Sequence, residues 1–386
     1  MNRRIPGQEF LKTCTGCLLG GLLVAGAHPS AVTDALDSQK IDAVFADAGL
    51  KADRAPGAAV LVVRNGRIVF ERGYGVADLR SFRKIDEHTD FRLASVSKQF
   101  TAMAIMLLVH DGKLHYEDRL TDIFPDFPAY GKSITIRHLL NHTSGLADYE
   151  DLMPASDSRL PVEQVQIQDS GVLDLLKRQS RTKFMPGSRW AYSNSGYVVL
   201  GLIVGKVSGK PFPDFLHERI FVPLEMTSTI AYVRGSNTVP NRAFGHSLQG
   251  SKWIETDQSP TSATLGDGGV YSSIEDLARW DSALRDHRLL SEQELQAAFT
   301  PVKVTEDQPT EPDGAPAAYG FGWFLNSYRG HQRAWHYGET MGFRTAIQRF
   351  TNDGLTVIVL TNRADLSPTA LALRVADLYL LSPEQP

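Results

Sequence analysis

The chain has 386 residues, of which 42% are hydrophobic and 22% are charged, and its formal net charge is −4. This composition is typical of a globular protein with enough chain for a large core, in two domains or in one domain with an insertion. The weakly acidic balance gives no sign of a nucleic-acid partner or of an anionic membrane partner.

The first 27 residues differ from the rest of the chain. Arg3, Arg4 and Lys12 precede a short apolar run that ends in small residues, which is the order of a secretory signal peptide. We therefore expect residues 1–27 to be a signal peptide and the protein to be exported, periplasmic or secreted. The alternative is an N-terminal anchor that is never cleaved. Both cysteines of the chain lie in this segment, so the expected mature chain has neither a disulfide nor a thiolate metal site.

The next elements have clear local patterns. Apolar residues at helical spacing predict a helix over 41–48 that ends near Gly49. Residues 58–73 are predicted to form a β-hairpin, because Asn65-Gly66 joins two β-rich runs. The pattern over 97–109 predicts a long helix.

The middle and the end of the chain differ in pattern. The stretch from about 125 to 265 carries helix signals and prolines, whereas the last third has short β-like runs and one closing helix. This order predicts an α/β (α+β) fold, in which helices flank an antiparallel sheet built from both chain ends. The predicted divisions are an α/β domain over 28–125 and 265–386 and a mostly helical inserted region over 126–264.

The spacing Ser-x-x-Lys occurs three times, as Ser81/Lys84, Ser95/Lys98 and Ser180/Lys183. Of these serines, Ser95 alone directly precedes a long apolar helix, where unpaired backbone N–H groups and the helix dipole are available. Lys98 would lie one turn along the same face. Acyl transfer needs such a hydroxyl, a nearby amine that can take its proton, and backbone donors for an oxyanion. The alternative is a serine N-cap with a surface lysine.

Two later motifs hold further candidate residues. Tyr192-Ser-Asn194 supplies a possible general acid or base and an amide that can hold a carbonyl, although Ser-Asn-Ser-Gly is also ordinary turn chemistry. His336-Tyr-Gly338 lies in a strand-like stretch where glycine allows close approach of a ligand, and its alternative is a half-exposed strand histidine.

In the order Ser-x-x-Lys, Tyr-x-Asn and His-x-Gly, the motifs resemble the serine β-lactamase and penicillin-binding protein superfamily. The sequence around the motifs is similar to that of the class C branch, which includes class C β-lactamases, D-Ala-D-Ala carboxypeptidases, D-aminopeptidases and esterases. The segments with this similarity are 139–149, 186–201, 220–229 and 266–280.

The resemblance implies a role for each residue. Ser95 would be the acylating nucleophile, Lys98 its activating partner, and Tyr192 the proton shuttle and the base for the deacylating water. Asn194 would hold the substrate's amide or the lysine, and Asn194, His336 and Gly338 are the expected substrate-binding residues. The backbone N–H groups of Ser95 and Glu339 would form the oxyanion hole.

The last motif departs from the pattern of the family. His336 stands where lactamases usually have lysine, and a histidine carries only part of a positive charge near neutral pH. Tyr337 replaces a small hydroxyl residue, and Glu339 adds a negative charge. These differences favour a peptidase or esterase over a class C-like β-lactamase.

The expected partner is a small-molecule or peptide substrate with an acyl carbonyl, in transient contact with the cell wall, and we expect no cofactor. A catalytically silent, penicillin-binding-like module that binds cell-wall peptides or a partner protein remains the alternative. His138 and His142 have the i, i+4 spacing of zinc ligands, but no acidic residue follows His138 as in His-Glu-x-x-His, and we interpret both as structural, with no metal.

Overall fold

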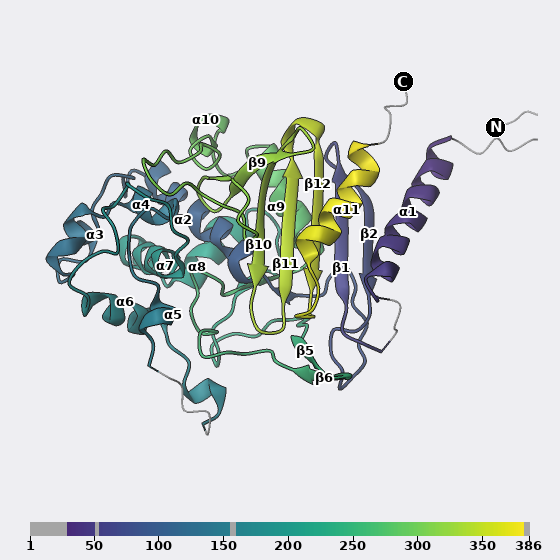
Figure 1. Cartoon of the computed structure of the whole chain (residues 1–386), viewed down its shortest axis with the longest axis horizontal. Coiled ribbons are helices and arrows are strands. Elements are labelled where there is room, and N and C mark those ends of the chain that lie inside the picture. The colour runs from purple at the N-terminus through teal and green to yellow at the C-terminus, as the bar shows by residue number, and fades with distance from the viewer. Residues whose placement is uncertain (1–28, 51–53, 155–159, 382–386) are drawn as a thin grey trace, which may run out of the picture.

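The computed structural model describes residues 29–50, 54–154 and 160–381. Its centre is a seven-stranded antiparallel sheet with the strand order β2-β1-β12-β11-β10-β9-β8 (Figure 1). The strands are β1 (Ala58–Arg64), β2 (Arg67–Tyr74), β8 (Ala318–Tyr319), β9 (Phe324–Tyr328), β10 (His331–Glu339), β11 (Arg344–Phe350) and β12 (Leu355–Thr361). Strands from both ends of the chain therefore pair in one sheet, which confirms the predicted fold class.

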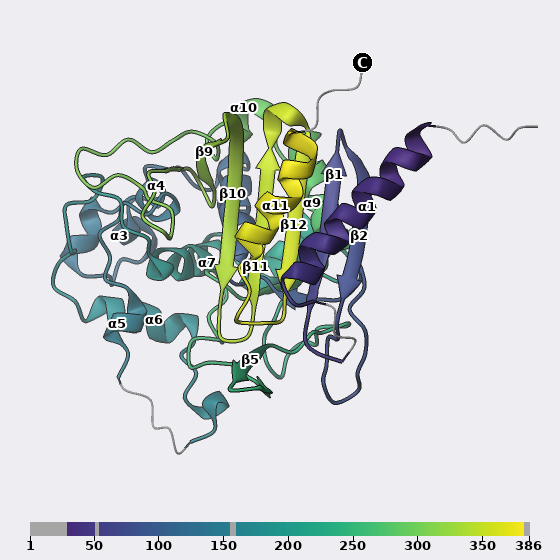
Figure 2. The same ribbon diagram turned by 45° about the vertical axis from the view of Figure 1, so that its right-hand side comes forward.

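The hairpin of β1 and β2 turns at Asn65 and Gly66, both with positive φ, as the Asn-Gly signal predicts. Strand β1 is buried on both faces, so its residues alternate between two hydrophobic cores. Helices α1 (Pro29–Asp47) and α11 (Pro368–Leu380) lie side by side over one face, as Figure 2 shows. The two ends of the chain therefore build one layer.

The other face of the sheet carries α2 (Lys98–His110) and α9 (Ile274–Arg285), and it continues into a group of helices beside the sheet (Figure 1). The helices beyond α2 are α3 (Leu120–Ile123), α4 (Ile136–Leu140), α5 (Tyr149–Leu152), α6 (Asp169–Lys177), α7 (Asn194–Ser208), α8 (Phe212–Leu216) and α10 (Glu292–Leu295). The short strands are β3 (Phe91–Arg92), β4 (Ile230–Ala231), β5 (His246–Gln249), β6 (Lys252–Glu255) and β7 (Val270–Ser272).

The predicted helix over 97–109 is confirmed as α2, which follows a 3-10 turn, η1 (Ala94–Ser97). Most of the regular structure described between 126 and 264 is helical, with β4, β5 and β6 as additions. The division into domains stays a prediction. The predicted signal peptide, 1–27, lies outside the described residues. Within the described ranges, the structure contains no helix with the length and apolar character needed to cross a membrane.

A buried ion pair fixes α9 to the inner face of the sheet. The Asp281 carboxylate accepts hydrogen bonds from Arg349 of β11 at 2.7 Å and from Thr356 of β12 at 2.8 Å. All three residues are buried. Removing the carboxylate would leave the Arg349 charge without its acceptor, which is costly in a buried position.

We predict that Asp281→Ala lowers the free energy of unfolding by about 3 kcal/mol, because the guanidinium stays buried without its partner. Urea unfolding followed by circular dichroism measures this change. Asp286→Ala is the control, because Asp286 follows the same helix but is half-exposed, and an exposed pair contributes at most about 1 kcal/mol. Equal effects of the two substitutions would contradict the role of Asp281.

Candidate active site

The candidate nucleophile lies in η1, at the junction of the sheet and α2. Ser95 is partly exposed while its neighbours on either side are buried, so its hydroxyl is accessible. The preceding residue, Ala94, has a φ of +48°, which an L-residue adopts only when its surroundings impose it. The tight turn therefore presents Ser95 at the edge of the core.

Lys98 is the first residue of α2 and is fully buried. Its Nζ donates hydrogen bonds to Ser95 Oγ, Asn194 Oδ1 and the Asp267 carbonyl oxygen, each at 2.9 Å. Burial lowers the pKa of this amine to about 8, although nearby carboxylates partly oppose the shift. The amine can therefore lose its proton near neutral pH and accept the proton of the serine hydroxyl.

The other two Ser-x-x-Lys pairs have no such surroundings. The Ser81 hydroxyl donates to Asp78 on an exposed turn. Ser180 is exposed, and Lys183 forms an ion pair with Asp151 at 3.0 Å. Ser95 and Lys98, in contrast, hydrogen-bond to each other, and Lys98 also meets Asn194 of another predicted motif.

Tyr192 lies against the lysine, with Lys98 Nζ 4.9 Å from the centre of its ring. Its hydroxyl oxygen is buried and makes no hydrogen bond within the described structure. Burial raises the pKa of Tyr192 well above its ordinary value, and the neighbouring Ser95 hydroxyl opposes the shift only in part. Tyr192 is therefore a neutral hydroxyl at physiological pH and can relay a proton more readily than it can act as a phenolate base.

Asn194 begins α7, where the Ser193 side chain caps the helix. While its Oδ1 accepts from Lys98, its backbone N–H donates to Asp148 at 3.1 Å and its Nδ2 donates to Glu150 at 3.3 Å. Burial, followed by the charge of Asp148, raises the pKa of the Glu150 carboxyl. Two carboxyl groups thus surround the amide that holds the lysine.

His336 lies on β10 and is fully buried. Its Nδ1 is 2.6 Å from the Tyr337 carbonyl oxygen, which can only accept, so Nδ1 carries the proton and Nε2 accepts from the Tyr319 hydroxyl at 3.0 Å. Burial and the charge of Lys98 lower the pKa of His336 to about 3. The histidine is therefore neutral at physiological pH and supplies even less positive charge than expected, and its role in substrate binding stays a prediction.

Gly338 lies where β10 passes the nucleophile turn. A Cβ at this position would be 2.0 Å from the Leu93 carbonyl oxygen and 2.4 Å from Thr345 Oγ1, so only glycine fits. The close neighbour is the chain itself, two residues before Ser95. Among the described strands, β9 pairs with β10 no farther than Trp335, which leaves the edge of β10 beside Gly338 open. Glu339 ends this edge, and the oxyanion role of its N–H and that of Ser95 stays a prediction.

Both histidines considered as zinc ligands have structural partners. His138 Nδ1 accepts the Thr135 backbone N–H in the cap of α4, and His142 Nδ1 accepts the Ser193 backbone N–H at 3.1 Å. His142 thereby supports the segment that carries Tyr192 and Asn194. In the ranges that the structure describes, no group of three or more histidine, cysteine and acidic side chains is placed to hold a metal ion.

A cavity of about 650 Å³ opens beside the carboxyl groups, and both Glu150 and Glu339 line it. Arg344 also lines it, but its guanidinium is paired with Glu339 at 2.8 Å. The remaining lining residues are Met153, Pro154, Ser259, Pro260, Thr261, Thr340 and Met341. The cavity is therefore mixed in polarity, with its positive charge already paired.

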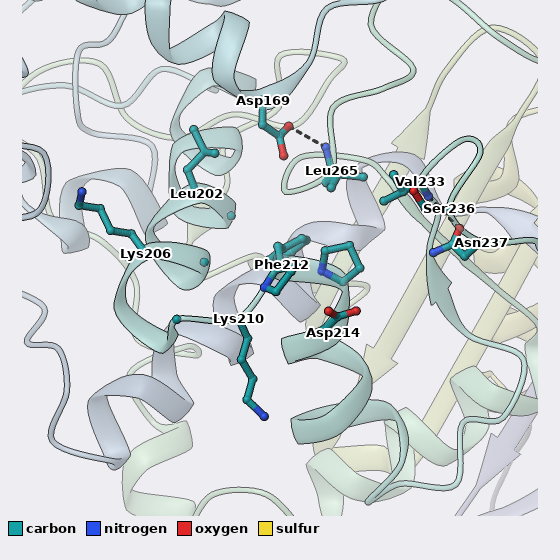
Figure 3. A pocket seen from close by; sticks show the side chains of 15 residues that line it. Asp169, Leu202, Lys206, Lys210, Phe212, Asp214, Val233, Ser236, Asn237 and Leu265 are labelled. Carbon is teal, nitrogen blue, oxygen red and sulfur yellow. Dashed lines mark hydrogen bonds between the residues drawn. The ribbon is translucent and has the colours of Figure 1, made fainter.

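A second cavity, of about 800 Å³, lies along the C-terminal half of α7 and the turn after it, where Leu202, Lys206 and Lys210 line it (Figure 3). Asn194 is at the other end of this helix. The Leu265 N–H donates a hydrogen bond to Asp169 at its edge, at 3.0 Å. None of the predicted catalytic residues lines this cavity, so its size does not make it the acyl-transfer site.

Sequence reasoning missed three residues that the structure brings to Lys98 and Asn194. Asp148 and Glu150 lie in the loop after α4 and at the start of α5, and Asp267 lies in the loop before β7. Asp148 and Asp267 fall in segments that resemble the class C branch, and Glu150 directly follows one of these segments. However, nothing in their local pattern shows that they meet at the lysine.

Comparison with known proteins gives the family of the chain. The family model described as Beta-lactamase matches residues 42–381. Penicillin-binding protein 4* of Bacillus subtilis (strain 168) is 34% identical over 321 residues, which are 79% of this chain and 68% of that protein. A D-aminopeptidase of Brucella canis is 28% identical over 337 residues, 84% of this chain but only 60% of that protein.

Solved structures of penicillin-binding proteins and amidases share the fold of this chain. The D-amino acid amidase of Ochrobactrum anthropi SV3, complexed with L-phenylalanine amide, aligns with a TM-score of 0.73 and 26% identity. This alignment covers 88% of the present chain and 97% of the amidase. The match to the family model over most of the chain, together with the relatives, shows that the protein belongs to the beta-lactamase family of serine hydrolase-type, penicillin-binding protein-like proteins.

Proposed function

We propose that the protein is a serine hydrolase that forms a covalent acyl-enzyme on Ser95 and cleaves amide bonds of small substrates that carry a free amine. The observation that carries this proposal is the hydrogen bond of 2.9 Å between Ser95 Oγ and the buried Lys98 Nζ. A neutral amine at this distance takes the hydroxyl proton while Ser95 Oγ forms a bond to the substrate carbonyl carbon.

The other residues complete the proposed cycle. The Ser95 and Glu339 N–H groups stabilise the oxyanion, and the neutral Tyr192 hydroxyl passes a proton to the leaving amine. Lys98 then replaces the proton that Tyr192 has lost. Water attacks the acyl carbon and gives one proton to the Tyr192 and Lys98 pair, which passes it to Ser95 Oγ as the bond to the acyl carbon breaks and the acid is released. The open edge of β10 can align the backbone of a peptide-like substrate by strand addition.

The charge around the site favours a substrate with an amine over one with a carboxylate. Glu150 and Glu339 line the adjacent cavity, and Arg344, which could bind a carboxylate, is paired with Glu339. This balance supports an aminopeptidase or amidase, in agreement with the names of the Brucella canis and Ochrobactrum anthropi relatives. A D-Ala-D-Ala carboxypeptidase or a β-lactamase would instead need a free cation for the substrate carboxylate.

We also propose that the protein is exported and meets peptide fragments of the cell wall, which contain D-amino acids. The basic and apolar leader over 1–27 supports export. Fractionation of cells expressing the full chain tests this proposal: recovery in the cytoplasm with the leader intact would contradict it.

We predict that Ser95→Ala lowers kcat for D-alanine p-nitroanilide by about 10³-fold or more, as expected when a nucleophile is lost. Intact-protein mass spectrometry after a fluorophosphonate probe should show one adduct on the wild type and none on the variant. Ser180→Ala is the matched control, because it alters an exposed serine of another Ser-x-x-Lys pair.

Three other results would each change the assignment. If Ser95→Ala turned over substrate at the wild-type rate, Ser95 would not be the nucleophile. Hydrolysis of benzylpenicillin in preference to the anilide would identify a β-lactamase. A folded wild type without any adduct or turnover would indicate a silent binding module.

We predict that kcat/KM rises with pH through an apparent pKa of about 8, because only the neutral Lys98 amine can take the serine proton. Below this pH the ammonium form predominates and kcat/KM should fall about tenfold per pH unit. This acid limb is measured as kcat/KM for anilide hydrolysis against pH. Activity that stays constant from about pH 6 to pH 9 would rule out Lys98 as the base.

We predict that Glu150→Gln lowers kcat/KM for D-alanine p-nitroanilide about tenfold, since a charged hydrogen bond contributes roughly 1.5–3 kcal/mol. The assay is run at about pH 9, above the pKa of Lys98, so that the change does not act through the lysine. p-Nitrophenyl acetate, which has no amine, is the control substrate. Equal losses on both substrates would show that Glu150 does not bind the amine.

A further inference from the structure

The buried Lys98 amine is held by one residue that none of the three motifs contains. Of its three hydrogen bonds, one goes to the backbone carbonyl of Asp267. An ammonium group has three N–H donors, and the structure provides three acceptors. The neutral amine has two N–H donors and one lone pair, so the Ser95 hydroxyl must then donate while Asn194 and Asp267 keep the nitrogen in place.

The side chain of Asp267 adds a second feature. Asp267 is 6% exposed, and the Tyr149 hydroxyl donates to its Oδ2 at 3.1 Å. The other oxygen, Oδ1, is buried and has no hydrogen-bond partner in the described structure. A buried carboxylate left half-satisfied is costly unless an opposite charge lies nearby. Burial raises the pKa of the Asp267 carboxyl group, and the positive charges of Lys98 and, to a smaller extent, Arg92 oppose this rise.

Asp267 is the strongest charged neighbour of the lysine. Its negative charge raises the pKa of Lys98 more than those of Asp148 and Glu150 do, and all three oppose the effect of burial. The other polar and titratable groups around Lys98 are Ser95, Asn194, His142, Tyr192, Tyr197 and His336. Burial keeps both histidines and both tyrosines neutral at physiological pH, because it lowers the pKa of each histidine and raises that of each tyrosine.

We propose that Asp267 is a positioning residue that holds Lys98 as an ammonium ion in the resting enzyme and thereby sets the pH at which Ser95 becomes reactive. The inference rests on the proposed function, in which Lys98 is the base. Asp267 does not touch the reacting atoms. It acts through the lysine, by its carbonyl contact and by the charge of its carboxylate.

This role leads to an unusual expectation for Asp267→Asn. The substitution removes the negative charge but keeps the backbone carbonyl that holds Nζ. Without the charge, Lys98 loses its proton more easily, so the acid limb of kcat/KM should move to lower pH by about one unit or more. At about pH 6.5 the variant should therefore be roughly tenfold faster than the wild type, and at about pH 9.5 the two should be similar.

Two further variants separate charge from structure. Asp267→Glu keeps the charge and should keep the limb near its wild-type position. Asp169→Asn is the control, because Asp169 is a partly buried carboxyl group that binds the N–H of Leu265, two residues before Asp267, on the side of the second cavity (Figure 3). Burial raises the pKa of Asp169 to about 7, so this control is read above pH 7, where Asp169 is ionised. Asp169 is not among the charges that act on Lys98, so the acid limb of kcat/KM should stay in place in the Asp169→Asn variant.

The experiment measures two quantities against pH: kcat/KM for D-alanine p-nitroanilide and the rate at which a fluorophosphonate probe labels Ser95. The labelling rate reports the lysine even if the anilide proves to be a poor substrate. Absence of both turnover and labelling in the wild type would refute the proposed function itself. An unchanged limb in Asp267→Asn, or a uniform loss of rate at every pH, would refute the role of Asp267 alone.

Another variant serves if Asp267→Asn does not fold, as judged by circular dichroism. Tyr149→Phe removes the hydroxyl that donates to the carboxylate and leaves the aspartate in place. Losing a donor raises the pKa of the carboxyl group, so the negative charge near Lys98 weakens and the limb should shift in the same direction by a smaller amount. A limb that stays in place or moves to higher pH would contradict the inference.

Discussion

The site depends on one buried amine. Lys98 Nζ is held by oxygen atoms from three segments that are distant in the chain: the nucleophile turn, the start of α7 and the loop before β7. In apolar surroundings alone the amine would lose its proton well below neutral pH, and among many carboxylates it would keep it. The opposing effects leave its pKa at about 8, in the range where a base can take up a proton and release it again.

The sheet fixes the position of the nucleophile relative to this amine. Gly338 lets β10 approach the Leu93 carbonyl oxygen, and Thr345 of β11 donates a hydrogen bond of 2.7 Å to the same atom. The turn that follows is tight, and Ala94 adopts a positive φ within it. Because both strands are central in the sheet, the turn cannot relax without disturbing the core. The strain in the backbone thus serves to keep Ser95 directed at Lys98.

Much of this arrangement could be predicted because it depends on local signals. The Asn65-Gly66 hairpin, the long helix after Ser95 and the closing strands each follow from a pattern within a few residues. The pairing of Ser95 with Lys98 also follows locally, since a spacing of three at a helix start brings the two side chains to one face. The meeting of this pair with Tyr192 and Asn194 required the resemblance to a family, because no local pattern fixes a contact between distant loops.

The charge states of the site residues could not be predicted, because they depend on burial. His336 could be recognised as a candidate, but its neutral state depends on the Tyr337 carbonyl, the Tyr319 hydroxyl and complete exclusion from solvent. Likewise, Asp267 has no motif of its own, and its effect arises because its loop packs against α2 and α7.

The neutrality of His336 and the charge of Asp267 belong together. A second cation at position 336 would compete with Lys98 for the nearby carboxylates and would itself favour loss of the Lys98 proton. With a neutral histidine there, Lys98 is the strongest positive charge that acts on Asp267, and Asp267 is the strongest negative charge that acts on Lys98. The absence of a second lysine and the presence of an aspartate in the loop before β7 therefore act in the same direction: both favour the protonated form of Lys98.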